Sequence, residues 1–98
     1  MMDLQVIEDS YKGMGLVALR QSDKPGLVYE PHRHAEVRLY TIRGSAKMKL
    51  DDQEWQNTEP GQEIIIHDNQ LHEAVVGPEG WEYIYASSPE EAKRQGLL

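Results

Sequence analysis

The sequence predicts an all-β domain, a sandwich or a closed barrel, with one short helix near the C-terminus. About eight to ten short apolar or alternating runs recur at spacings of roughly 8 to 12 residues, a pattern typical of these folds. Turn-forming residues such as Gly, Pro, Asp and Asn separate the runs. The last segment carries the start and stop signals of a helix.

The first half of the chain begins the sheet. Pro25 and Gly26 predict a turn, because proline fixes φ and glycine can adopt a positive φ. Gly44 closes the longest run, which is rich in residues that favour a pleated backbone. The strands expected in this half lie at residues 4–7, 14–20, 27–29 and 31–44.

The second half begins with a predicted hairpin. Residues 46–50 alternate apolar and basic side chains, which is the pattern of a half-buried strand. Asp51 and Asp52 then turn the chain into residues 54–58. Further strands are expected at residues 63–66, 73–76 and 81–86.

The terminal helix is expected over residues 89–95. Ser88 is a natural N-cap, Pro89 suits the first helical position, and Glu91 completes a capping box. Gly96 can adopt the positive φ that ends many helices. We expect this acidic helix to form a solvated cap on the barrel.

Length and composition predict one domain. The 98 residues fit a single domain 1–98, with a barrel over about 4–87 and the helix over about 89–95. The net charge of -7 argues against a nucleic acid or an anionic membrane as a partner. No apolar run approaches the ~20 residues that span a bilayer, and the N-terminus lacks the regions of a signal peptide. We therefore expect a cytoplasmic location. Because the chain has no cysteine, any transition metal must be bound by His and carboxylate side chains.

The stretch from Pro31 to Tyr40 holds two of the four histidines and a nearby carboxylate. In an extended chain the side chains alternate between faces, so His32, His34 and Glu36 would point the same way. Three potential metal ligands would then share one surface. The other interpretation is that the two histidines are solvated polar residues on an exposed strand, and the pair alone does not decide.

Two linked motifs resemble those of the cupins, a family of small double-stranded β-barrels. In the first motif a glycine precedes His-x-His and a second glycine ends the stretch; here Gly26 precedes His32 and His34, and Gly44 follows. In the second motif a glycine precedes a single histidine, as the run from residue 61 to His72 does here. The resemblance covers about residues 14–86.

The chain departs from both family motifs. In the second motif His67, Asn69 and Val76 replace a family Pro, Gly and Asn. Asn tolerates the left-handed conformation that a glycine supplies, so the change at position 69 is mild.

In the first motif the stretch after His34 is one residue short. Counting forward from His34 places the family glutamate at Arg38 or Leu39, and counting back from Gly44 places it at Val37.

The resemblance implies a double-stranded β-helix, the cupin jelly-roll barrel, with His32, His34 and His72 converging inside it on one divalent metal ion. Glu36, the only acid near the family position, is the candidate fourth ligand. Three imidazoles, with or without a carboxylate, suit Fe(II), Ni, Mn, Zn or Cu and leave coordination positions open.

Other side chains are candidates for catalysis or substrate binding. His67 and Tyr40 are candidate proton-transfer groups, although His67 is also expected as a solvated loop residue. Arg38 could bind a substrate carboxylate or pair with Glu36. Tyr29 is a candidate substrate contact in an aromatic pocket. The aromatic residues that could line this pocket are Tyr29, Tyr40, Tyr83, Tyr85 and Trp81.

Three function classes remain open. The resemblance implies a small metalloenzyme acting on a small organic molecule, since cupins include dioxygenases, isomerases and lyases. Alternatively the barrel is a small-molecule or metal-binding sensor module, because 98 residues leave little beyond it to form a lid; a purely structural barrel is a third class. Sheet edges and exposed tryptophans predict a homodimer.

Overall fold

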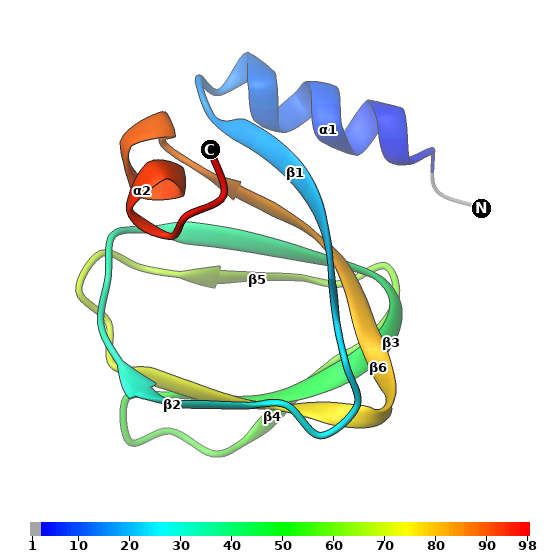
Figure 1. Cartoon of the computed structure of the whole chain (residues 1–98), viewed down its shortest axis with the longest axis vertical. Helices are drawn as coiled ribbons and strands as arrows, with labels where there is room; N and C mark the ends of the chain where they lie inside the picture. The colour runs from blue at the N-terminus through cyan, green and yellow to red at the C-terminus, as the bar shows by residue number, and fades with distance from the viewer. Residues whose placement is uncertain (1–2) are drawn as a thin grey trace.

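The structure, a computed structural model, describes residues 3–98 (Figure 1). Two helices flank a barrel in which strands β3 and β6 are the longest and pair along most of their length. No helix within residues 3–98 is long and apolar enough to cross a membrane. The elements in chain order are α1 Leu4–Gly13, β1 Val17–Asp23, β2 Val28–His32, β3 Val37–Leu50, β4 Gln56–Thr58, β5 Glu63–Ile66, β6 His72–Ser87 and α2 Pro89–Arg94.

Strands β3 and β6 bend together and so contribute to two sheets, each antiparallel. What we call the β1 sheet contains β1, the second half of β6, the first half of β3 and β5. The β2 sheet contains β2, the first half of β6, the second half of β3 and β4. Facing sheets that share strands in this way form the double-stranded β-helix, so the predicted fold class is confirmed.

Glycines allow the bend. Gly44 has φ +76° and Gly80 has φ +83°, a region that other residues rarely adopt. A Cβ atom at Gly44 would lie 2.0 Å from the carbonyl oxygen of Gly80. The backbones of β3 and β6 can therefore approach this closely only because residue 44 has no side chain.

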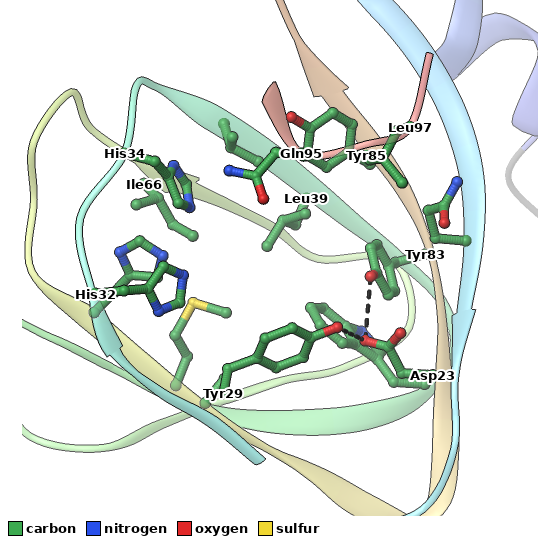
Figure 2. A pocket seen from close by; sticks show the side chains of 16 residues that line it. Asp23, Tyr29, His32, His34, Leu39, Ile66, Tyr83, Tyr85, Gln95 and Leu97 are labelled. Carbon is green, nitrogen blue, oxygen red and sulfur yellow. Dashed lines mark hydrogen bonds between the residues drawn. The ribbon is translucent and has the colours of Figure 1, made fainter. Parts of the chain in front are cut away.

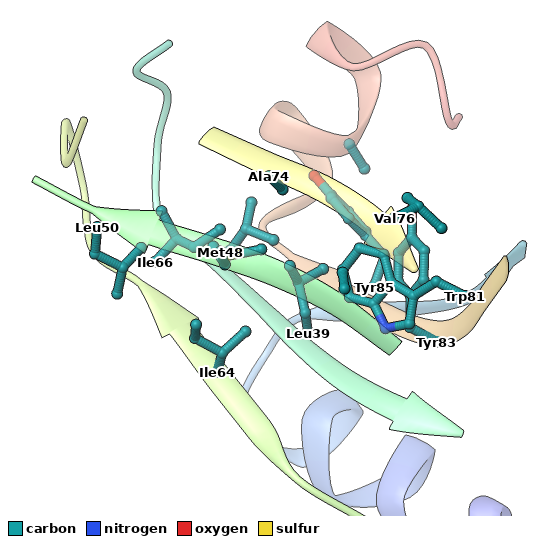
Figure 3. Packing of buried hydrophobic residues seen from close by; sticks show 13 residues of the cluster. Leu39, Met48, Leu50, Ile64, Ile66, Ala74, Val76, Trp81, Tyr83 and Tyr85 are labelled. Carbon is teal, nitrogen blue, oxygen red and sulfur yellow. The ribbon is translucent and has the colours of Figure 1, made fainter. Parts of the chain in front are cut away.

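The main core lies between the two sheets. Alternate residues of β3 and β6 point inward, as strand geometry requires, and pack against β5 (Figure 3). Each of the larger apolar side chains buried there contributes roughly 1.5–3 kcal/mol to folding. The labelled members are Leu39, Met48, Leu50, Ile64, Ile66, Ala74, Val76, Trp81, Tyr83 and Tyr85.

The strand predicted at residues 4–7 is wrong, because these residues begin helix α1. The Asp3 side chain caps the helix by accepting a hydrogen bond from the Gln5 amide. Leu4, Ile7 and Tyr11 recur at helical spacing and pack on the outer face of the β1 sheet. Four residues were too short a window to show this period, so the barrel begins at β1 and not at residue 4.

Other strand boundaries differ from the prediction: the strand expected at residues 14–20 is Val17–Asp23, and the strand expected at residues 31–44 begins at Val37. The expected breaks after Gly44 and at residues 77–80 are bends inside continuous strands, because the glycines there redirect the chain without ending the pairing. The hairpin into β4 and the buried strand β5 are confirmed.

The terminal helix α2 is also confirmed. The Ser88 hydroxyl accepts a hydrogen bond from the Glu91 amide, and Gly96 has φ +76°. The carboxylate of Glu91 does not complete a capping box. It turns instead to Arg94 and Gln95.

Candidate metal centre

Three histidines from two sequence regions meet inside the barrel. His32 ends β2, His34 follows in the loop to β3, and His72 begins β6. His32 and His72 are direct register partners between β2 and β6. One nitrogen of each ring lies within 4.8 Å of one from each of the other two, and the His32 and His72 ring centroids are 4.1 Å apart. This group could hold a metal ion.

Hydrogen bonds fix the same ring nitrogen in all three residues. Nδ1 lies 2.6 Å from the Glu30 carbonyl oxygen in His32 and 2.8 Å from the Gln70 carbonyl oxygen in His72. In His34 it lies 2.7 Å from the carbonyl oxygen of the next residue. A carbonyl can only accept, so Nδ1 carries a proton in each ring, and the lone pair of the neutral ring then lies on Nε2. Each ring is thereby held in the tautomer that a metal ligand needs.

The protonation state of His72 also suits a ligand. Burial, together with the neighbouring rings of His32 and His34, lowers the pKa of His72 to about 4, although the hydrogen bond to the Gln70 carbonyl opposes this shift. The ring is therefore neutral at neutral pH. A metal ion can bind to it there without displacing a proton.

The group opens into a cavity of about 350 Å³ between the sheets (Figure 2). Val37 and Leu39 line it, while Arg38 lies between them on the strand and does not. Val37 and Leu39 are two of the positions at which the spacing of the cupin motif would place its glutamate. This wall therefore carries no carboxylate, and three neutral imidazoles would leave a divalent ion with its full charge.

A second polar group lies across the cavity from the histidines. Oδ2 of Asp23 accepts hydrogen bonds from the hydroxyls of Tyr29 at 2.6 Å and Tyr83 at 3.1 Å (Figure 2). Burial, reinforced by this carboxylate, raises the pKa of Tyr29 to about 12. Burial, together with Tyr29 and Asp23, raises the pKa of Tyr83 as well. Both phenols remain protonated donors at neutral pH.

The third side of the cavity comes from α2 and the residues after it. Gln95 and Leu97 line it, with Gln95 drawn between His34 and Tyr85 (Figure 2). The Tyr85 hydroxyl is buried and has no hydrogen-bond partner among residues 3–98. Such a group is costly unless something bonds to it, so it is a further contact point for a ligand.

Glu36 does not join the three histidines. The chain bends at residue 35, which breaks the alternation on which the prediction for Glu36 rested. Its carboxylate lies 3.6 Å from Arg38 Nε and 3.8 Å from His67 Nδ1, and its side chain is 44% exposed. Arg38 thus pairs with Glu36, which was the alternative weighed for it.

The two candidate proton-transfer residues also lie away from the cavity. His67 is on the surface, with 68% of its side chain exposed. Tyr40 is buried on the outer face of the β1 sheet, where it packs with Tyr11 of α1. Neither lines the cavity, and neither does Arg38. These three side chains therefore lie outside the cavity beside the histidine group.

Of the aromatic residues expected in a pocket, four line this cavity: Tyr29, Trp81, Tyr83 and Tyr85. Sequence reasoning missed Asp23, which it placed in a turn, and Gln95, which it placed on a solvated helix. It also expected Glu91 on a solvated helix, whereas the Glu91 side chain is only 1% exposed. Alternation along β1 could have pointed to Asp23, because Gln21 and Asp23 lie two apart and both face the cavity.

Residues 15–94 match the model of the AraC-like ligand binding domain family. The chain belongs to that family. Its structural neighbours include several cupins, so the predicted resemblance to small cupin domains is confirmed. No curated protein sequence matches the chain.

Three solved structures illustrate the likeness. KdgF from Halomonas sp. is 23% identical over 74% of this chain and 66% of that one, with a TM-score of 0.65. The DMSP lyase DddQ from Ruegeria pomeroyi is 19% identical over 74% of this chain and 37% of that one, with a TM-score of 0.66. A cupin superfamily protein from Desulfitobacterium hafniense is 14% identical over 74% and 66%, with a TM-score of 0.64. At these identities the likeness concerns the fold, and the cupin domain spans only part of each neighbour.

Proposed function

We propose that this cupin is a small metalloenzyme that acts on a small organic molecule. The observation that carries the proposal is the set of three histidines, each with Nδ1 bonded to a backbone carbonyl and Nε2 free, at one end of a cavity of about 350 Å³. A cavity of this size suits a small organic molecule. The reaction is of the lyase, isomerase or dioxygenase type.

His32, His34 and His72 would hold one divalent ion, either Fe, Ni, Mn, Zn or Cu. Such an ion supplies Lewis-acid polarisation of a bound oxygen or an activated water at neutral pH. The chain's own residues would bind and orient the substrate. Tyr29 and Tyr83, held by Asp23, form the opposite wall, and the apolar side chains of Val37 and Leu39 exclude water beside the histidines.

The neighbours lend support to this class of reaction. A solved structure with a TM-score of 0.66 is a DMSP lyase, so the same barrel serves an enzyme elsewhere. The fold alone does not carry an activity from one protein to another. The histidine group gives the proposal its chemical content.

The test is a substrate screen on metal-free protein reloaded with each of the five metals in turn. Turnover that depends on the metal, is lost in His72→Ala and is kept in His67→Ala would support the proposal. His67→Ala is the matched control because it removes the histidine that lies outside the group. Turnover that persists in His72→Ala would overturn the role of the histidines.

A second candidate function is a non-catalytic sensor or binding module. The observation in its favour is the family match, since that family is described as a ligand binding domain. In this case the same cavity would hold a small ligand or the metal without turnover. Saturable binding of a compound that is recovered unchanged would favour the sensor over the enzyme.

We also propose a homodimer, in a cytoplasmic protein. Helix α1 covers the outer face of the β1 sheet, whereas the outer face of the β2 sheet carries exposed Val28, Trp55 and Val75. Trp81, also expected at the surface, is buried. Light scattering should show a dimer that Trp55→Glu dissociates and Val6→Glu, an exposed apolar site on α1, leaves intact.

A further inference from the structure

The side of the cavity opposite the histidines carries a carboxylate without a cationic partner among residues 3–98 (Figure 2). Asp23 forms no ion pair among residues 3–98, and its two hydrogen bonds, from Tyr29 and Tyr83, both reach Oδ2. Its Oδ1 therefore keeps its full capacity to accept. Neutral phenols do not cancel a carboxylate charge, so this end of the cavity favours a positive group.

The rest of the lining strengthens this preference. Among residues 3–98, Asp23 is the only carboxylate in this lining, and no Lys or Arg lines it. A ligand with an anionic group at this end would meet Asp23 and no compensating cation. Anionic groups such as a second carboxylate or a phosphate are therefore disfavoured here.

Aromatic rings stand beside Asp23. Trp81 is its register partner on β6, and the Trp81 ring stacks on Tyr83 with centroids 4.0 Å apart. The indole nitrogen of Trp81 is already satisfied by donating to the Thr41 hydroxyl. Trp81 and Tyr83 both line the cavity, so aromatic surface lies beside Asp23, with no polar atom of Trp81 left to satisfy.

We propose that Asp23, Tyr29, Trp81 and Tyr83 form a subsite for an ammonium group of a small ligand. The opposite end of that ligand, an oxygen or a carboxylate, would lie at the three histidines. The placement of this opposite end rests on the proposed metal site, whereas the ammonium subsite rests on the residues around Asp23. A dipolar molecule with a positive and a negative end matches the two ends of the cavity.

The test uses the two tryptophans. Trp55 is exposed and Trp81 lines the cavity, so Trp55→Phe makes Trp81 the sole tryptophan and its fluorescence a reporter of binding. The probes are trimethylammonium carboxylates with increasing numbers of methylenes, each compared with the isostere in which carbon replaces the charged nitrogen. In metal-loaded protein the cationic member of the best-fitting pair should bind at least about tenfold more tightly.

Asp23→Asn should remove most of that preference and leave the metal content unchanged. Glu82→Gln is the matched control, because Glu82 follows Trp81 on β6, pairs with Arg43 and does not line the cavity. If Asp23→Asn fails to fold, Tyr29→Phe replaces it as the test variant. It should lose less of the preference for the cationic probe, because the Asp23 carboxylate remains. Equal binding of the two isosteres, or a preference unchanged in Asp23→Asn, would overturn the proposal.

Tetramethylammonium separates this proposal from the metal site. It has no carboxylate and needs no metal, so it should bind metal-free parent protein more tightly than metal-free Asp23→Asn. Tetramethylammonium binding without any metal uptake would contradict the proposed metal centre and keep the ammonium subsite. Metal uptake, combined with tetramethylammonium binding that Asp23→Asn does not weaken, would support the metal centre and contradict the ammonium subsite.

Discussion

His32 and His72 are direct partners in the antiparallel pairing of β2 with β6, and their ring centroids lie 4.1 Å apart. The pairing of β2 shifts register between Tyr29 and His32, so the end of this strand is irregular. Strand β2 pairs with β6 alone and is therefore an edge strand. A metal shared by these two histidines would tie the edge of the barrel to its central strand.

We predict that metal binding protects β2 from hydrogen exchange. At a metal concentration a hundred times Kd, exchange of the β2 amides that pair with β6 should slow by up to ~100-fold, because the ion binds only the closed state. Strand β4 is the internal control, since it is an edge strand of the same sheet that contributes no ligand. Equal protection of β4, or none of β2, would contradict this prediction.

Alkaline pH should destabilise the protein through Tyr29. Its folded pKa of about 12 lies above the ordinary value of 10.0. A raised pKa means that the stability is fully present below about pH 10 and is lost as pH rises towards 12. Tyrosinate absorbance should show this late ionisation. In Asp23→Asn the pKa of Tyr29 should fall, but stay above 10.0 because burial remains its largest cause; no change would contradict the hydrogen bond.

Glu91 should stabilise α2 and the tail that lines the cavity. Its carboxylate accepts hydrogen bonds from Arg94 Nε at 2.9 Å and Gln95 Nε2 at 2.6 Å. Glu91→Ala should lower the free energy of unfolding in urea by about 1–3 kcal/mol, because the Glu91 side chain is buried and its hydrogen bonds to Arg94 and Gln95 are lost. Glu90→Ala, at an exposed position of the same helical turn, should cost far less.

The pH dependence of this contribution follows from the pKa of Glu91. Burial alone would raise the pKa, but the hydrogen bonds from Gln95 and Arg94 outweigh it and lower the pKa below 4.5. A lowered carboxyl pKa stabilises the fold above pH 4.5, and this stability is lost as pH falls through the folded pKa. A parent and Glu91→Ala that lose stability equally on acidification would contradict this account.

Leu39→Glu should change metal preference. Leu39 lies in the cavity wall at a position where the cupin spacing offers a glutamate. An unpaired carboxylate there should destabilise the metal-free protein by about 2–5 kcal/mol. It should also raise the affinity for Mn²⁺ more than for Cu²⁺, since oxygen ligands suit the harder ion. Leu39→Gln is the neutral control, and equal Mn²⁺ affinities in the two variants would contradict the prediction.

Local patterns in the sequence predicted a sandwich or barrel, and the resemblance to the cupin motifs predicted that His72 joins His32 and His34. Strand alternation and turn residues depend on near neighbours, and the spacing of His32, His34 and His72 matches motifs of a known family. Glu36 was misplaced because one bend at residue 35 changed which face it occupies. A single residue of shift is enough to turn a side chain from the cavity to the surface.

The other half of the cavity depends on contacts that the sequence does not reveal. Asp23 meets Tyr83 across 60 positions of the chain, and Gln95 reaches the cavity only because α2 folds back over the barrel. Long-range packing decided each of these positions.

The most direct test is the metal content of tag-free protein, measured by mass spectrometry after reconstitution, for parent, His32→Ala/His72→Ala and His67→Ala. The account predicts about one equivalent in the parent and in His67→Ala, and close to none in the double variant, because two of three ligands are lost. Equal metal content in the parent and the double variant would contradict the claim that these histidines form the metal centre.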